Sequence, residues 1–162
     1  MPLSGLVVGI DHIGVCVGEL DAAAELWAQL LGAPVAHREC VDAQRTEAAF
    51  LELGGPAGLR SAGGEAERSP LKVEPATVEL VAPMAGNVGL AKFLAKRGDG
   101  LHHVAFAVRD LKLALARLAE AGVALIDREP RPGARGHLVA FLHPKAMNGT
   151  LVELVERKEH RT

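Results

Sequence analysis

The pattern of apolar and polar residues occurs twice along the chain. Residues 10–17, IDHIGVCV, can be laid over residues 101–108, LHHVAFAV, without a gap, and the match continues from residues 19–21 to residues 110–112. Both copies are rich in the β-branched and apolar residues typical of a strand. The repeat therefore predicts two related halves, each opening with a strand.

Apolar residues at helical spacing follow each copy of the strand and end at a glycine, Gly32 in the first half and Gly122 in the second. They predict helices over residues 21–31 and 111–121. Further β-branched and apolar runs, separated by Gly, Pro or Asn, predict strands at residues 34–38, 45–53, 77–81, 124–128, 137–143 and 150–155. Each half therefore has the predicted order β-α-β-β-β.

The length of 162 residues fits a single α+β domain made of two paired βαβββ modules. We expect the first module at residues 6–84, a linking helix at 87–98 and the second module at 100–157. The stretch 54–76 is rich in Gly, Pro, Ser and charged residues, so we expect a surface loop there and assign it no chemistry.

Composition argues against two kinds of partner. The formal net charge is −2 and the chain has no Tyr, so we expect binding neither to nucleic acid nor to a membrane. No apolar stretch approaches the roughly 18 residues of a membrane-spanning helix, and the first residues lack the basic start of a signal peptide. The two cysteines, Cys16 and Cys40, are expected to be reduced thiols, which favours a cytoplasmic protein.

The histidines of the two strand copies are the first candidates for chemistry. The overlay pairs His12 with His103, while His102 falls on Asp11. Because neighbouring residues of a strand point to opposite faces, His103 shares the environment of His12. His102 is then expected on the outer face or as support for His103.

The last strands of the two halves also match, VELV at residues 78–81 and at 152–155. Each places a glutamate, Glu79 or Glu153, inside an apolar run, where an unpaired buried charge costs several kcal/mol. Two imidazoles and two carboxylates at equivalent positions predict a divalent-metal site formed by His12, Glu79, His103 and Glu153.

The remaining histidines have no partners in register. We expect His37, His137 and His160 at the surface and His143 in a turn.

Three separated blocks carry a resemblance to a known family. They are IDHIGVCVGELDAAAELWAQLLG from residue 10, KFLAKRGDGLHHVAFAV from residue 92 and VAFLHPKAMNGTLVELVE from residue 139. In these blocks the chain resembles the methylmalonyl-CoA epimerases of the vicinal oxygen chelate superfamily. The likeness covers nearly the whole chain outside residues 54–76.

This resemblance implies an open eight-stranded cup around one divalent ion, such as Co²⁺, Mn²⁺, Zn²⁺ or Mg²⁺, and a homodimer. The family's ligand positions fall on His12, Glu79, His103 and Glu153. The implied activity is interconversion of the C2 epimers of methylmalonyl-CoA through a metal-stabilised enolate. Glu153 is then a proton-transfer group as well as a ligand.

A second proton-transfer group is needed on the other face of the substrate. Some family members have a glutamate in the strand equivalent to residues 45–53, and with Gln44 aligned its position here is Ala48. A one-residue bulge would turn the neighbouring Glu47 inward, so Glu47 is the predicted second group. Glu52, on the same face as Ala48, is the other option.

For the CoA portion of the substrate, the sequence offers Lys145, with Lys96 and Arg97 behind it, as cations for phosphate. Two alternatives to the epimerase remain open. One is a glyoxalase-type (lactoylglutathione lyase) isomerase, which the Glu at position 79 favours. The other is a non-catalytic small-molecule binding module of the same superfamily.

Overall fold

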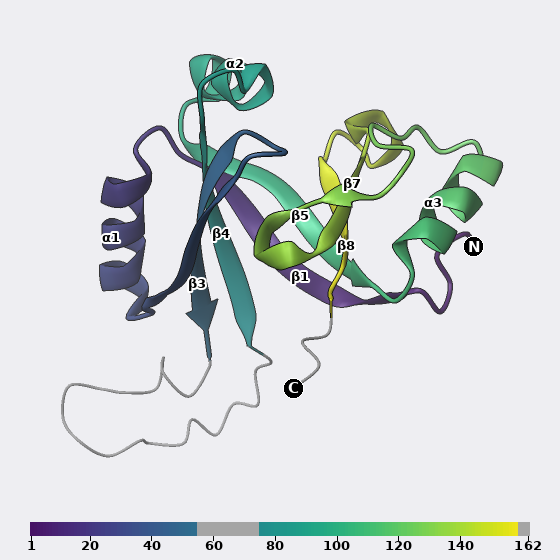
Figure 1. Cartoon of the computed structure of the whole chain (residues 1–162), viewed down its shortest axis with the longest axis horizontal. Helices are drawn as coiled ribbons and strands as arrows, with labels where there is room; N and C mark the ends of the chain where they lie inside the picture. Colours follow the sequence, from purple (N-terminus) through teal and green to yellow (C-terminus); the bar gives the residue numbers. More distant parts are fainter. Residues whose placement is uncertain (55–74, 159–162) are drawn as a thin grey trace.

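A computed structural model describes residues 1–54 and 75–158. Within these ranges, eight strands form one curled sheet in the order β2-β3-β4-β1-β5-β8-β7-β6 (Figure 1). The first half contains β1 (Val7–Cys16), α1 (Leu20–Leu31), β2 (Val35–Val41), β3 (Thr46–Leu53) and β4 (Ala76–Pro83). Helix α2 (Val88–Arg97) follows. The second half contains β5 (Gly100–Val108), α3 (Leu111–Glu120), β6 (Arg131–Pro132), β7 (Leu138–Leu142) and β8 (Val152–Glu156), with short 3-10 turns η1 (Ala134–Gly136) and η2 (Pro144–Ala146).

The two halves meet at the centre of the sheet. Strands β1 and β5, the two copies of the sequence repeat, pair antiparallel there. Each of them also pairs in parallel with the last strand of its own half, β1 with β4 and β5 with β8. The predicted α+β cup of two paired modules is therefore confirmed.

Strand alternation separates a helix-covered face from a cavity face. On β4, Val78 and Leu80 pack in one apolar cluster with residues of α1, whereas Glu79 lines the cavity. On β8, Val152 and Leu154 pack in a cluster with residues of α3, whereas Glu153 lines the cavity. Because side chains on a strand alternate, an apolar residue on each side of a glutamate directs the carboxylate into the cup.

The helices begin and end where the sequence pattern predicts, to within two residues. Asp110 caps α3 by accepting a hydrogen bond from the backbone N–H of Leu113 at 2.8 Å. Gly32 ends α1 with φ of 62°, a left-handed conformation that favours glycine.

The prediction of a strand at residues 124–128 is wrong. This segment has one isolated bridge, between Leu125 and Leu142, and the strand at this edge is β6, only two residues long. The carboxylate of Asp127 accepts the backbone N–H of Phe141 at 2.8 Å, in place of a regular ladder partner. Pro130 and Pro132 have no N–H to donate to a ladder.

Most of the predicted loop at 54–76, together with His160, lies outside the described residues. No helix in the described part of the chain is long and apolar enough to cross a membrane.

Candidate functional site

The two repeat-equivalent histidines meet on the cavity side of the central strands. Their Nε2 atoms lie 3.1 Å apart although 91 positions separate His12 and His103 in the chain. Both side chains are buried. The prediction that these two residues share one environment is therefore confirmed.

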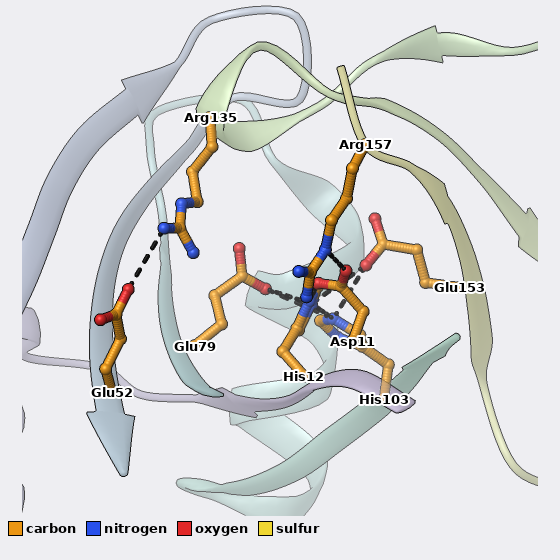
Figure 2. Close-up of polar contacts among 8 residues, drawn as sticks. All are labelled: Asp11, His12, Glu52, Glu79, His103, Arg135, Glu153 and Arg157. Carbon is orange, nitrogen blue, oxygen red and sulfur yellow. Dashed lines mark hydrogen bonds and ion pairs between the residues drawn. The ribbon is translucent and has the colours of Figure 1, made fainter. Parts of the chain in front are cut away.

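The repeat-equivalent glutamates flank this pair. Oε2 of Glu79 lies 3.2 Å from Nε2 of His12 and 3.3 Å from Nε2 of His103. Oε2 of Glu153 lies 3.1 Å and 3.4 Å from the same two atoms. Figure 2 shows the two carboxylates on opposite sides of the imidazoles. The structure thus brings together all four residues that the sequence selected.

The residue that precedes each histidine contacts its Nδ1 atom, on the side of the imidazole ring away from the cluster. Oδ1 of Asp11 lies 2.9 Å from Nδ1 of His12, and Oδ2 of Asp11 accepts from Nε of Arg157 (Figure 2). In the other half, Nδ1 of His102 lies 3.0 Å from Nδ1 of His103. With Nδ1 engaged in this way, the Nε2 atom of each histidine faces the cluster.

The carboxylates strongly favour protonated imidazoles. Burial by itself lowers the pKa of His12, but contacts with Asp11, Glu153 and Glu79 raise that pKa to about 12. The pKa of His103 is raised in the same way, against burial, to about 9 by Glu153 and Glu79. Burial and the adjacent positive charge of His103 lower the pKa of His102 to about 4.

The glutamates show the opposite change. Burial raises the pKa of a carboxyl group, but contacts with His103 and His12 lower the pKa of Glu79 to about 2. The same contacts lower the pKa of Glu153 against its burial. Without a metal ion, protons on the imidazoles therefore compensate the two buried carboxylates.

The donor set fits a divalent cation. One donor atom each from His12, Glu79 and His103 lies within 4.8 Å of the others, and Glu153 contacts both histidines. Bonds of about 2.0–2.1 Å place neighbouring ligand atoms roughly 3.0–3.4 Å apart. The four nitrogen–oxygen separations of 3.1–3.4 Å match that spacing. Two imidazoles and two carboxylates suit ions such as Zn²⁺, Mn²⁺ or Co²⁺.

The cluster lies in a cavity of about 320 Å³, a volume that suits a small ligand or one end of a larger one. Its walls combine apolar side chains of the sheet with polar side chains from both halves. Among the lining residues are Gln44, Thr46, Phe50, Asn87, His102, Arg131, Arg135, His137, Val139 and Phe141.

The structure does not bring Glu47 to this cavity. Strand β3 pairs with β4 without a bulge, so Thr46 and Phe50 face the cavity while Glu47 is exposed on the other face. Ala48, where some family members have glutamate, is buried in an apolar cluster. Glu52 contacts Arg135 at 3.3 Å and is not among the lining residues. The inward turn predicted for Glu47 is therefore wrong, because the bulge it requires is absent from β3.

Three cations predicted for the CoA portion lie outside the cavity lining. Lys96 and Arg97 are exposed in the last turn of α2, and Lys145 is exposed in η2. His143 is a turn residue as predicted, because its Nδ1 accepts from the backbone N–H of Lys145 at 3.1 Å.

Sequence reasoning missed three cationic or titratable residues of the cavity wall. His137 was expected at the surface but is half-buried and lines the cavity. Arg131 and Arg135 lie on either side of the proline- and glycine-rich turn at residues 132–133. The sequence shows the two arginines, but no pattern in the neighbouring residues predicts that this segment lies against the cavity.

A family model agrees with this geometry. Residues 11–141 match the glyoxalase/bleomycin resistance protein/dioxygenase superfamily. This match covers both histidines and Glu79.

Relatives that match at least 90% of this chain are more specific. The ethylmalonyl-CoA/methylmalonyl-CoA epimerase of Cereibacter sphaeroides is 33% identical over 90% of this chain and 95% of its own. The crystal structure of methylmalonyl-CoA epimerase from Mycobacterium tuberculosis is 35% identical, with a TM-score of 0.79 over 95% of this chain and 91% of that one. A methylmalonyl-CoA epimerase in complex with methylmalonyl-CoA and NH4+ is 33% identical, with a TM-score of 0.77 over 93% and 94%. The chain therefore belongs to the glyoxalase/bleomycin resistance protein/dioxygenase superfamily and, within it, to the family of the methylmalonyl-CoA epimerases.

Proposed function

We propose that this protein is a metal-dependent isomerase that interconverts the two C2 epimers of methylmalonyl-CoA. The observation that carries the proposal is the meeting of two imidazoles and two carboxylates, from equivalent positions of the two halves, in a cavity of about 320 Å³. Two relatives that are 33% and 35% identical to this chain are named as methylmalonyl-CoA epimerases, which supports the proposal.

The four cluster residues would hold the ion. His12 and His103 offer Nε2, and Glu79 and Glu153 offer one carboxylate oxygen each. When bound, a divalent ion supplies Lewis-acid stabilisation of the negative charge that develops on substrate oxygens. Co²⁺, Mn²⁺, Zn²⁺ and Mg²⁺ are the ions to test.

Epimerisation requires removal of the proton from C2 and return of a proton to the opposite face. We assign one of these transfers to the Glu153 carboxylate. The cavity lining in the described residues holds three carboxylates, those of Asp11, Glu79 and Glu153, and Asp11 is engaged with His12 and Arg157. Glu79 lies on the other side of the histidines from Glu153 (Figure 2), so Glu79 takes the second role in place of Glu47.

The cavity accepts the acyl end, while the nucleotide end of CoA is too large for it and extends outside. We propose that the exposed Lys145, Lys96 and Arg97 attract its phosphates at the surface. Raising the salt concentration should then weaken CoA thioester binding, because screening acts on exposed charges.

We also propose a cytoplasmic homodimer. Ile10 on β1 is 67% exposed and Leu101 on β5 is 61% exposed, with Val8 exposed nearby in sequence. Exposed apolar residues on the two central strands fit a surface covered by a second copy. Analytical ultracentrifugation tests this proposal. Wild-type protein should sediment as a dimer and Ile10→Arg as a monomer.

Deuterium exchange tests the reaction. Methylmalonyl-CoA incubated with the protein in D₂O, with each of the four metals, should gain one deuterium at C2 by mass spectrometry. No exchange with any metal would contradict the proposal. Production of lactoylglutathione from methylglyoxal and glutathione would favour the glyoxalase-type alternative. Tight ligand binding without either reaction would favour the non-catalytic binding module.

Two variants test the proton-transfer assignment. If each carboxylate serves one face, Glu153→Gln and Glu79→Gln should both abolish interconversion, and each should still exchange deuterium into one epimer only. Metal content is measured on both variants, because both residues are also proposed ligands. Glu129→Gln, an exposed residue outside the cavity lining, is the control.

A further inference from the structure

The residue that precedes each cluster histidine is an extra residue in its strand. The register between β1 and β5 shifts between Ile10 and His12, which leaves Asp11 without a cross-strand partner. A second shift leaves out His102, at the equivalent position of β5. A β-bulge of this kind turns a side chain away from the direction that strand alternation gives it. The two bulges therefore bring Asp11 and His102 to the cavity wall, beside the histidines that follow them.

Asp11 differs from His102 because it brings a charge that needs compensation. Its side chain is only 10% exposed, and an unpaired carboxylate at such a site is strongly unfavourable. A metal-bound imidazole is neutral, so His12 would donate Nδ1–H to Asp11 without neutralising it. Within residues 1–54 and 75–158, the arginine or lysine paired with Asp11 is Arg157, whose Nε lies 2.5 Å from Oδ2. Arg157 therefore supplies the countercharge once the cluster holds an ion.

Arg157 connects two proposed ligands from different halves. It follows β8, the strand of Glu153, and its side chain reaches Asp11 on β1 although β5 lies between these strands (Figure 2). His12 and Glu153 are both cross-strand partners of Ala105 on β5. The link therefore spans the same three strands as these two ligands.

The reverse link, from the first half to the second, lacks its residue. The overlay of residues 78–81 on 152–155 puts Pro83 at the position of Arg157, and proline has no side-chain donor. His102, the counterpart of Asp11, packs against Phe93 of α2 instead, edge to face with ring centroids 5.0 Å apart. The charged support therefore acts on His12 and not on His103.

The contact with Arg157 fixes the orientation of the Asp11 carboxylate. One carboxylate oxygen faces Nδ1 of His12 at 2.9 Å, and the other accepts from Arg157. With both oxygens engaged, the carboxylate is held against the imidazole ring. The Arg157 side chain is 56% exposed, so water screens the direct effect of its charge on the ion. Its effect on the site is therefore geometric and passes through Asp11.

We infer that Arg157 is a positioning residue of the metal site, which holds the Asp11 carboxylate against Nδ1 of His12 and so orients Nε2 of that histidine toward the ion. Metal-binding histidines depend on such outer partners for the ring orientation and for the tautomer that leaves the ligand nitrogen free. This inference rests on the metal site of the proposed function, and it adds a residue that does not touch the ion.

The affinity for Co²⁺, followed by its visible absorption, tests the inference. Arg157→Gln should raise the Kd about 5- to 10-fold, a smaller effect than that of Asp11→Asn because the carboxylate itself remains. Arg157→Lys can still donate to Oδ2 and should restore part of the affinity. Lys158→Gln removes the same charge from the next residue, which is exposed and outside the cavity lining, and should leave the Kd within twofold of wild type. An equal loss in Lys158→Gln, or no loss in Arg157→Gln, overturns the inference.

A double variant shows whether Arg157 acts through Asp11. In the Asp11→Asn background, Arg157→Gln should change the Co²⁺ affinity less than twofold, because the carboxylate that Arg157 positions is absent. Two residues that act independently would give additive losses, and additivity overturns the inference.

The Nδ1 proton of His12 gives a readout that a merely structural role would not move. In wild-type protein loaded with Zn²⁺, NMR of labelled histidines should show this proton far downfield, because it is donated to a carboxylate. Arg157→Gln should move it upfield and leave the Nδ1 proton of His103 in place. Equal shifts at both histidines would indicate general loosening of the sheet, and no shift at His12 would show that its ring keeps its orientation. Either result overturns the inference.

The outcome is separable from that of the proposed function. If wild-type protein binds Co²⁺ but exchanges no deuterium at C2, and Arg157→Gln weakens Co²⁺ binding as expected, the reaction is wrong and the role of Arg157 stands. If wild-type protein exchanges deuterium and Arg157→Gln changes neither the Co²⁺ affinity nor the His12 proton, only the role of Arg157 is wrong.

Discussion

Oδ1 of Asp11 lies 2.9 Å from Nδ1 of His12, the next residue in the chain. The other oxygen of Asp11 is bonded to Arg157, near the end of the described chain. A carboxylate behind a metal-binding imidazole fixes the ring orientation and makes the ligand nitrogen a better donor. In the second half, the neutral ring of His102 has the equivalent place behind His103. The two halves thus support their histidines with groups of different charge.

Asp11→Asn should therefore weaken metal binding about 10- to 100-fold, because an amide supports the imidazole less well than a carboxylate. The Kd of Co²⁺, followed by its visible absorption, measures the effect. Asp21→Asn is the matched control, since Asp21 is exposed and bonded to Arg38. A Co²⁺ affinity within twofold of wild type in Asp11→Asn would show that Asp11 does not act through His12.

The four cluster residues could be found from sequence because each lies on a strand that has an equivalent in the other half of the chain. A gapless overlay transfers the orientation of one histidine to the other, and the apolar neighbours of Glu79 and Glu153 define which way each carboxylate points. The contact of Asp11 with His12 was not predicted. Alternation placed Asp11 on the opposite face, but its carboxylate reaches Nδ1 of its neighbour.

The arginines of the cavity wall could not be found in this way. Segment 131–137 has almost no regular structure, and its position depends on contacts with Glu39 and Gln44, which are about 90 residues away. Strand alternation carries no information about such a segment. The prediction for Glu47 was wrong for a different reason. It required a one-residue bulge in β3, but β3 pairs with β4 without a register shift.

Gly14 leaves the space that the His103 ring occupies. The two residues are cross-strand partners between β1 and β5, and a methyl group on Gly14 would overlap the imidazole. Gly14→Ala should therefore displace His103, lower the free energy of unfolding by about 1–3 kcal/mol and strongly reduce metal affinity. Thermal unfolding and Co²⁺ titration measure the two effects.

Gly100→Ala is the control for Gly14→Ala. Gly100 also lies on the β1–β5 pair, but a methyl group there meets no atom within 4 Å. Equal metal affinities in the two variants would mean that His103 tolerates the displacement and is not required at its observed position.

Glu47→Gln should leave the rate of deuterium exchange at C2 within twofold of wild type. Its side chain is exposed on the face of β3 opposite the cavity, so it cannot reach a substrate held at the cluster. The rate is measured for both epimers, under the same conditions as for Glu153→Gln, which should retain exchange in one epimer only. A loss of more than tenfold in Glu47→Gln would require β3 to shift its register when substrate binds.

The two cysteines should differ sharply in reactivity. Cys16 is fully buried, and this burial, together with the negative Asp99, raises the pKa of its thiol to about 11, whereas Cys40 is exposed. The thiolate is the reactive form, and a raised pKa keeps the thiol protonated until the pH approaches that value. At pH 8, three units below, about one Cys16 in a thousand would be ionised even with free access to reagent.

Iodoacetamide at pH 8 should therefore modify native protein once per chain, at Cys40, and twice after unfolding in guanidinium. Peptide mass spectrometry locates the label. Cys40→Ser should take up no label while folded and one label when unfolded, which separates burial of Cys16 from any intrinsic lack of reactivity. Labelling of native Cys16 at a rate comparable to Cys40 would show that β1 opens readily at its C-terminal end, next to the strands that carry the cluster.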